Sequence, residues 1–231
     1  MTISLQDNFP VYFDADGTLL DSLTAHGQFC RDMNERFKCR LVLPDLQDLN
    51  GWRAVVGSPM KRFMQNAGFS YEMLEELVRV YETEFSKDPR YKVKAFSGIY
   101  TLLRKLKNRN IPLGIITSNC RENVQSSLRG VFGVFDEITD RSDLDKYNLQ
   151  EGRKLESWEA KARALRDVAQ RFGISSDRLT YVGDTQPDYK AAVSAKTGFI
   201  WAAYCWQDPG QREGVISARS IKELSALLLK D

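Results

Sequence analysis

The stretch Val11-Tyr-Phe-Asp14-Ala-Asp16-Gly-Thr18 decides the fold that we expect for this chain. Its first three residues form a short apolar run that favours a buried strand, and the acidic, glycine-bearing sequence after it favours a turn. Apolar runs recur later in the chain, and two of them also end in polar residues. The sequence therefore predicts strands within residues 112–119, 179–184 and 198–204, and a weaker one at 135–139.

Segments with a helical spacing of apolar residues lie between these runs. Apolar side chains recur at i, i+3, i+4 and i+7 in residues 99–106 and again in residues 165–172. Strands that alternate with helices indicate a parallel sheet covered by helices on both faces. We therefore predict an α/β, Rossmann-like core whose functional site lies beyond the carboxyl ends of the strands.

Residues 21–94 interrupt this alternation, because they show apolar stripes with helical spacing and no convincing strand. The sequence predicts that they form an inserted α-helical domain, and that residues 1–20 and 95–231 form the α/β core domain. The Met and aromatic side chains of these stripes are interpreted as core packing. Residues 140–157 are polar and long for a connection, which favours a flexible excursion.

The composition narrows the class of protein. The chain has 231 residues, of which 42% are hydrophobic and 28% charged, as is typical of one or two ordinary domains. A formal charge of +2 is too weak to indicate a nucleic-acid partner, and no window approaches the roughly 20 apolar residues of a membrane span. The four cysteines include no C-x-x-C pair and are typical of reduced thiols, so we expect a cytoplasmic protein.

Asp14 and Asp16 are the first candidates for chemistry. They lie two positions apart at the end of a predicted strand, and extended backbone places both side chains on the same side. Two converging carboxylates can bind a hard divalent cation, and they can divide the work of a nucleophile and a proton carrier. The alternative is a simple turn, which is common for the Asp-Gly dipeptide.

Thr117 and Ser118 follow the apolar part of the predicted strand at 112–119. They offer a hydroxyl group and successive backbone N–H groups to an anion, just before a predicted helix whose N-terminus favours negative charge. This arrangement suits a phosphate group. The alternative is that Ser118 or Asn119 only caps the helix.

Asp184 and Asp188 place two more carboxylates at the same predicted edge of the sheet. Asp184 would complete a metal site, and Asp188 would orient a lysine or a metal-bound water, or only add favourable charge at a helix N-terminus.

A phosphoryl group among carboxylates also needs a cation. Lys161 is the first choice, because it lies in the first turn of the helix that leads into the 179–184 strand. Lys154 is its rival, and a solvated lysine is the alternative for either.

Four elements of the sequence, taken in order, resemble the motifs of the haloacid dehalogenase superfamily of phosphotransferases. With h for an apolar residue, they are hhhhDxDGT, hhhhTSN, a lysine and hhhGDxxxD. The resemblance covers residues 12–188. The mainly helical insertion after the first motif is similar to that of the helical-cap (C1) subgroup, which includes phosphoglycolate phosphatases and beta-phosphoglucomutases. The resemblance therefore implies a haloacid dehalogenase-like core with a helical cap.

Carried over to the matching positions, the resemblance implies catalytic roles. Asp14 would be the nucleophile that forms an aspartyl-phosphate. Asp16 would protonate the leaving oxygen and then act as the base that activates water. Thr117, Ser118 and Lys161 would hold the phosphoryl oxygens.

The resemblance also implies a Mg²⁺ cofactor and an activity. The Asp14 carboxylate, the Asp16 backbone carbonyl and Asp184 would bind the ion, with Asp188 in support. We therefore expect a Mg²⁺-dependent hydrolase of a small phosphorylated metabolite that is similar to phosphoglycolate phosphatase. The alternatives are a sugar phosphomutase similar to beta-phosphoglucomutase, and a non-catalytic protein that binds a phosphorylated ligand.

Substrate choice is expected to come from the helical segment. Lys61, Arg62 and Arg53 surround residues 57–59, in a stretch that resembles the cap loop facing the active site in this subgroup. The alternative for these cations is a solvated helix face. His26 shares a helical face with apolar residues, which favours packing, although its place after the first motif is similar to that of a histidine in beta-phosphoglucomutases.

Overall fold

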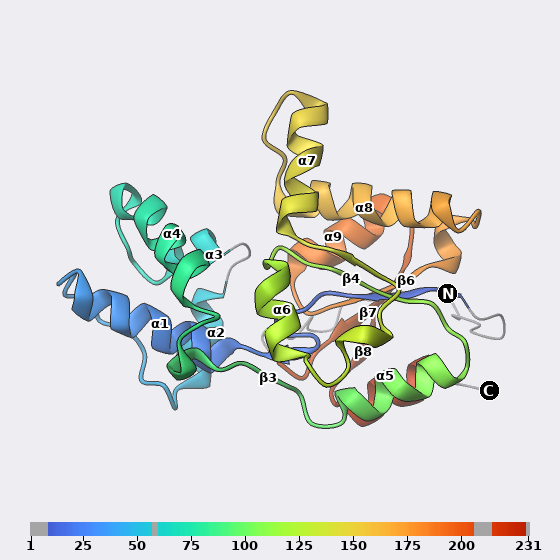
Figure 1. The fold of residues 1–231 in the computed structure, drawn as a ribbon, viewed down its shortest axis with the longest axis horizontal. Coiled ribbons are helices and arrows are strands. Elements are labelled where there is room, and N and C mark those ends of the chain that lie inside the picture. The colour runs from blue at the N-terminus through green and yellow to red at the C-terminus, as the bar shows by residue number, and fades with distance from the viewer. Residues whose placement is uncertain (1–8, 57–59, 206–213, 230–231) are drawn as a thin grey trace.

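The computed structural model describes residues 9–56, 60–205 and 214–229. Its centre is a six-stranded parallel sheet in the order β5-β4-β1-β6-β7-β8 (Figure 1). The predicted α/β, Rossmann-like fold is therefore confirmed, and each predicted run contributes a strand, whereas β8 was not predicted. The strands are β1 (Val11–Phe13), β4 (Leu113–Ile116), β5 (Glu137–Thr139), β6 (Thr180–Gly183), β7 (Gly198–Ala202) and β8 (Ile216–Ala218).

Helices cover both faces of this sheet (Figure 1). Val11 and Phe13 of β1 pack on one face, and Tyr12 packs on the other, as the alternation of side chains in a strand requires. A Cβ atom at Gly114 would lie 2.1 Å from the ring of Tyr12, so this position of β4 needs glycine. The first face is covered by α5 (Ile99–Asn108), α6 (Arg121–Ser127) and α10 (Ile221–Leu228), and the second by α8 (Ser157–Arg171) and α9 (Gln186–Ala195).

A group of helices stands beside the sheet (Figure 1) and packs around its own hydrophobic cluster, which includes Phe29, Trp52 and Phe63. Two short strands bound this segment and pair antiparallel, with Leu20 opposite Ala95. This pair was not predicted, because two-residue strands carry no readable alternation. The division into two domains stays a prediction. The elements are β2 (Leu20–Asp21), α1 (Leu23–Arg36), α2 (Leu49–Val55), α3 (Met60–Asn66), α4 (Leu74–Glu84) and β3 (Lys94–Ala95).

Helix α7 (Arg141–Glu151) corrects the expectation of a flexible excursion at 140–157. Asp140 and Asp143 form a capping box at its start, and Gly152 ends it in the left-handed region with φ 64°. Leu144 is its one buried residue, so the sequence shows no apolar stripe there. Single 3₁₀ turns lie elsewhere, at η1 (Tyr71–Met73), η2 (Pro89–Tyr91), η3 (Phe132–Val134) and η4 (Ser176–Arg178).

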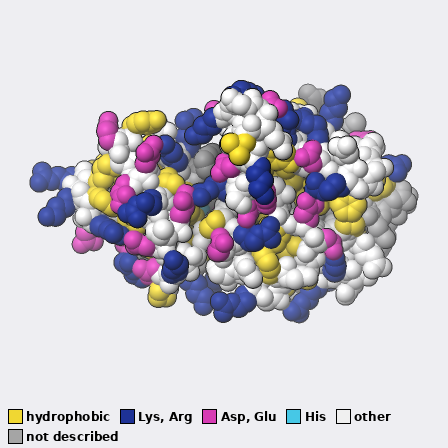
Figure 2. Space-filling view, turned by 45° about the horizontal axis from the view of Figure 1, so that its top comes forward, with side chains coloured by type: hydrophobic (Ala, Val, Ile, Leu, Met, Phe, Trp, Pro, Cys, Tyr) yellow, Lys and Arg dark blue, Asp and Glu magenta, His cyan; other side chains and the backbone are white. Residues whose placement is uncertain are grey.

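The surface carries charge of both signs. Figure 2 shows Lys and Arg side chains interspersed with Asp and Glu side chains over the face in view, as the near balance of charges predicts. Among the described residues, none of the helices has the length and apolar character needed to cross a bilayer.

Candidate active site

Three neighbouring strands bring the predicted acidic and hydroxylic residues together. Asp14 directly follows β1, which lies between β4 and β6. Thr117 directly follows β4, and Asp184 directly follows β6. All three side chains are buried. Because the strands are parallel, their carboxyl ends share one edge of the sheet, and segments distant in the chain meet there.

Lys161 is the cation of this cluster. Its side chain is fully buried, and its Nζ lies 3.1 Å from Asp14 Oδ1 and 2.7 Å from Asp188 Oδ1. Burial alone would lower the pKa of this ammonium group, but the carboxylates of Asp14 and Asp188 outweigh burial and raise the pKa above its ordinary value. Lys154 is exposed and lies in the connection between α7 and α8. The structure thus places Lys161, rather than Lys154, against Asp14.

Burial makes the ionised forms of Asp14 and Asp184 unfavourable in free energy. Burial raises the pKa of Asp14, with Lys161 opposing the shift, and burial also raises the pKa of Asp184 well above its ordinary value. Thr18 Oγ1 donates a hydrogen bond of 3.2 Å to Asp184 Oδ1. Asp184 Oδ2 is buried and accepts no hydrogen bond from the part of the chain that the structure describes. Such an oxygen is costly unless a cation or a donor compensates for lost water.

Asp188 differs because protein donors occupy both of its carboxylate oxygens. Lys161 Nζ and the Tyr181 hydroxyl, at 3.0 Å, both donate to Oδ1. The backbone N–H of Thr185, at 3.1 Å, and its hydroxyl both donate to Oδ2. This arrangement fits a group that orients Lys161 better than it fits a direct ligand of a metal ion.

The cluster has the composition of a site for a hard divalent cation. One carboxylate oxygen from each of Asp14, Asp184 and Asp188 lies within 4.8 Å of the others. Gly17 has φ 76°, and a Cβ atom there would lie 2.2 Å from Asp184 Oδ2, so only glycine fits against this buried, unbonded oxygen. Oxygen ligands alone suit Mg²⁺. The Asp16 carboxylate is not part of this close group.

Asp16 instead faces a small chamber above the cluster. The chamber has a volume of about 220 Å³, and its lining includes Asp14, Asp16, Thr117 and Ser118. Asp16 Oδ2 accepts a hydrogen bond of 2.7 Å from Asn119 Nδ2, and Thr117 Oγ1 accepts one of 3.1 Å from the Asn119 backbone N–H. Asn119 therefore holds the Asp16 carboxylate and the Thr117 hydroxyl in place. The expected proton carrier and the expected phosphate-binding hydroxyls share one space with the expected nucleophile.

His26 reaches this chamber from the helical segment. It is buried in α1, lines the chamber, and its Nε2 lies 3.1 Å from the Tyr81 hydroxyl. Burial lowers the pKa of His26. Its position agrees with the packing interpretation and also places its ring at the wall of the candidate site.

The three cations expected to choose the substrate lie in different places. Lys61 lines the chamber, and Arg62 lines an adjoining groove. Arg53 lines neither space, and its Nε donates a hydrogen bond of 2.8 Å to the backbone oxygen of Cys205. Residues 57–59, which begin the stretch that resembles the cap loop, lie outside the described residues.

Sequence reasoning assigned no role to several residues that hold the cluster in place. Thr18 and Thr185 belong to the DxDGT and GDxxxD motifs, so their position beside the acidic residues was a usable signal. Tyr181 gave no such signal, because an aromatic residue inside a buried strand predicts packing alone. Its hydroxyl nevertheless donates to Asp188, as described above.

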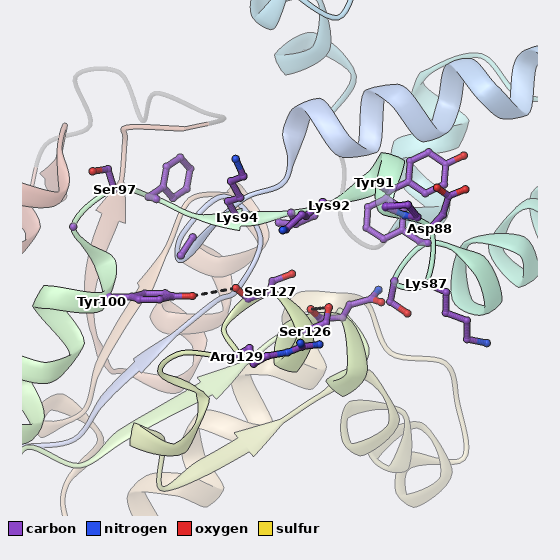
Figure 3. A pocket seen from close by; sticks show the side chains of 18 of the residues that line it. Lys87, Asp88, Tyr91, Lys92, Lys94, Ser97, Tyr100, Ser126, Ser127 and Arg129 are labelled. Atoms are coloured by element: carbon purple, nitrogen blue, oxygen red, sulfur yellow. Dashed lines mark hydrogen bonds between the residues drawn. The ribbon is translucent and has the colours of Figure 1, made fainter.

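A larger cavity contains none of the predicted site residues. It has a volume of about 780 Å³ and lies between the connection that carries β3 and helix α6 (Figure 3). Lys92, Lys94 and Arg129 line it, and the Tyr100 hydroxyl donates a hydrogen bond of 3.4 Å to the Ser127 backbone oxygen. The smaller chamber is therefore the candidate site because of the residues that line it, and not because of its volume.

A parallel α/β sheet with a buried acidic cluster and one lysine at its carboxyl edge is an arrangement suited to an enzyme that handles phosphate groups. The model of the haloacid dehalogenase-like hydrolase family matches residues 11–202. The chain belongs to this family, and it is an enzyme of the phosphatase type.

Individual relatives are named as phosphatases, as is typical of this family. A phosphoglycolate phosphatase from Synechococcus elongatus is 29% identical over 210 residues, which cover 85% of this chain and 83% of the relative. Pyrophosphatase PpaX from Bacillus velezensis is 24% identical and is covered to 82%, with 83% of this chain aligned. The crystal structure of a predicted phosphatase from Clostridium acetobutylicum has a TM-score of 0.74 and 24% identity, with 96% of this chain and 99% of that chain covered. This last similarity concerns the fold alone.

Proposed function

We propose that this protein is a Mg²⁺-dependent phosphomonoester hydrolase that acts on a small phosphorylated metabolite through an aspartyl-phosphate. The observation that carries the proposal is the 3.1 Å contact between the buried Lys161 and Asp14, which also lines the 220 Å³ chamber. A nucleophile needs a nearby cation when it approaches an anionic phosphoryl group, because the two would otherwise repel each other.

In the first step, a carboxylate oxygen of Asp14 attacks phosphorus. A new O–P bond forms while the P–O bond to the leaving group breaks. Asp16, in its protonated form, gives its proton to the departing oxygen, so an alcohol leaves. Lys161 and the hydroxyls of Thr117 and Ser118 hold the phosphoryl oxygens during this transfer.

In the second step, Asp16 acts as a base. Its carboxylate accepts a proton from a water molecule in the chamber, and the oxygen of that water attacks phosphorus. The bond between phosphorus and Asp14 breaks, which returns the Asp14 carboxylate and releases inorganic phosphate. Asn119 supports this role, because its hydrogen bond holds Asp16 Oδ2 in place while Asp16 Oδ1 has no hydrogen-bond donor among the described residues.

Asp14, Asp184 and the backbone carbonyl of Asp16 would hold the cation, with Asp188 in support through Lys161. A bound Mg²⁺ supplies positive charge that offsets the charge on the transferring phosphoryl oxygens. The unbonded Asp184 Oδ2 supports this assignment, and Gly17 packs against that oxygen where a side chain would collide with it.

A small substrate follows from the size of the chamber and from the relatives. About 220 Å³ accommodates a phosphoryl group with a few further atoms. The similarity to a phosphoglycolate phosphatase favours a short phosphorylated acid as substrate.

The test is phosphate release from a panel of phosphorylated metabolites, measured with and without Mg²⁺, for the wild type and for Asp14→Asn. We expect release that depends on Mg²⁺, and at least about a thousandfold loss of kcat in Asp14→Asn, because an amide is no nucleophile. Asp177→Asn, an exposed change in η4, is the matched control and keeps wild-type activity.

Two outcomes would contradict the proposal. Wild-type activity in a correctly folded Asp14→Asn variant rejects the nucleophile. Return of phosphate to another position of a sugar phosphate, with no net release, indicates the phosphomutase instead.

A further inference from the structure

The chamber that Asp14 lines adjoins a larger groove beside α7. The groove has a volume of about 810 Å³, against about 220 Å³ for the chamber. Residues from α7, from the start of α8 and from α3 line the groove, and Figure 1 shows α7 rising next to α8 on the side that faces α3. The two spaces adjoin, because both are lined by Lys61, Ser118, Arg141, Asp145, Lys154 and Thr185.

The groove is cationic overall. Five basic side chains line it, and two carboxylates oppose them. The basic residues are Lys61, Arg62, Arg141, Lys154 and Lys190, and the acidic ones are Asp145 and Glu156. The part of a substrate that extends from the chamber into this groove therefore meets a surplus of positive charge.

Three of these cations border both spaces, and two of them already have a partner. Arg141 forms an ion pair of 2.7 Å with Glu82 of α4. The Nζ of Lys61 lies 5.3 Å from the ring centroid of Tyr71. Lys154 forms no ion pair with any residue that the structure describes. Lys154 is therefore the cation available where the chamber meets the groove.

Lys154 and Lys161 face different parts of a substrate. Lys161 is buried against Asp14 and Asp188, so it acts where the phosphoryl group is transferred. Lys154 is exposed, lines both spaces and forms no ion pair with Asp14 or Asp188, so it can meet the part of a substrate that extends out of the chamber. An ammonium group there binds a carboxylate or phosphate through charge-assisted hydrogen bonds.

Given the proposed phosphatase function, on which this step rests, we infer that Lys154 binds a second anionic group on the leaving part of the substrate. The substrate class is then phosphomonoesters whose leaving group carries a carboxylate or a second phosphate. The connection after α7, and not only the helical segment, selects that class.

The experiment compares substrates in matched pairs. The carboxylate pair is 3-phosphoglycerate with glycerol 3-phosphate, and the phosphate pair is fructose 1,6-bisphosphate with fructose 6-phosphate. For each pair, the ratio of kcat/KM for the more anionic member to kcat/KM for its partner is measured in the wild type and in Lys154→Ala. Lys92→Ala is the matched control, because Lys92 is an exposed lysine in the separate cavity of Figure 3.

We expect Lys154→Ala to lower the ratio by about tenfold in at least one pair, mainly through KM, since one charge-assisted hydrogen bond is lost. Lys154→Arg restores most of the ratio, Lys154→Glu lowers it further, and Lys92→Ala leaves it unchanged. The pair that responds identifies the anionic group as carboxylate or phosphate.

An unchanged ratio in both pairs, with wild-type hydrolysis intact, overturns the assignment of Lys154 and leaves the proposed function standing. If the wild type releases no phosphate from any of the four compounds or from the wider panel, both proposals are overturned.

Discussion

Lys161 is the residue whose surroundings determine the chemistry of the site. It is fully buried between Asp14 and Asp188, so its removal leaves two buried carboxylates without their cation. We expect Lys161→Ala to lower kcat at least about a hundredfold and the free energy of unfolding by about 3 kcal/mol. Phosphate release and urea unfolding measure the two effects. Lys107→Ala, which breaks an exposed ion pair with Asp136, is the control and changes both only slightly.

Gly17 provides a second test at this scale. Its φ is 76°, and a Cβ atom at this position would lie 2.2 Å from Asp184 Oδ2, so alanine here combines backbone strain with a collision. Gly152→Ala separates the two effects, because Gly152 has φ 64° and its Cβ atom would meet nothing within 4 Å. We expect both alanine variants to lose about 1 kcal/mol of stability from the positive φ, and Gly17→Ala alone to lose Mg²⁺ affinity. Equal Mg²⁺ affinity in the two variants, measured by calorimetry, would refute this account of Gly17.

Candidate residues could be predicted from the sequence where they directly follow a predicted strand. They could not be predicted where their role depends on which side chains the fold buries. Asp14, Thr117 and Asp184 follow apolar runs, so their meeting at one edge followed from the predicted topology. Lys161 was preferred to Lys154 only for its place in a predicted helix, and its burial against Asp14, with Lys154 left exposed, depends on the fold.

At the scale of elements, α7 shows why periodicity fails for some helices. One buried residue gives no apolar stripe, so the capping groups at its ends define this helix better than its faces do. We expect Asp140→Ala to lower the free energy of unfolding by about 1 kcal/mol, because its carboxylate accepts the Asp143 backbone N–H at 3.1 Å. Urea unfolding measures this, with Asp177→Ala as the exposed control. No loss relative to that control would argue against the cap.

The molecule as a whole joins the helical segment to the sheet through polar contacts as well as apolar packing. Arg53 donates a hydrogen bond to the backbone oxygen of Cys205, and Arg141 pairs with Glu82 at the wall of the chamber, so residues far apart in the chain meet. Strand spacing predicted the sheet, but these contacts depend on long-range geometry that local patterns do not encode.

Mg²⁺ should stabilise the whole molecule, because an ion that binds only the folded state shifts the unfolding equilibrium. At a concentration about 100-fold above Kd, we expect Tm to rise by roughly 5 to 10 °C. Asp184→Asn should abolish the rise, since it removes a buried carboxylate of the cluster. Calorimetry with and without a chelator measures both, and a full rise in Asp184→Asn would exclude Asp184 as a ligand.

The most direct measurement of the central claim is chemical trapping of the phosphorylated enzyme. Wild-type protein is quenched with acid during turnover and reduced with borohydride, which converts an aspartyl-phosphate into homoserine, and the peptides are then sequenced by mass spectrometry. We expect homoserine at position 14 and at no other aspartate, and none in Asp14→Asn. An unmodified Asp14 during active turnover, or homoserine at Asp16, Asp184 or Asp188, would contradict it.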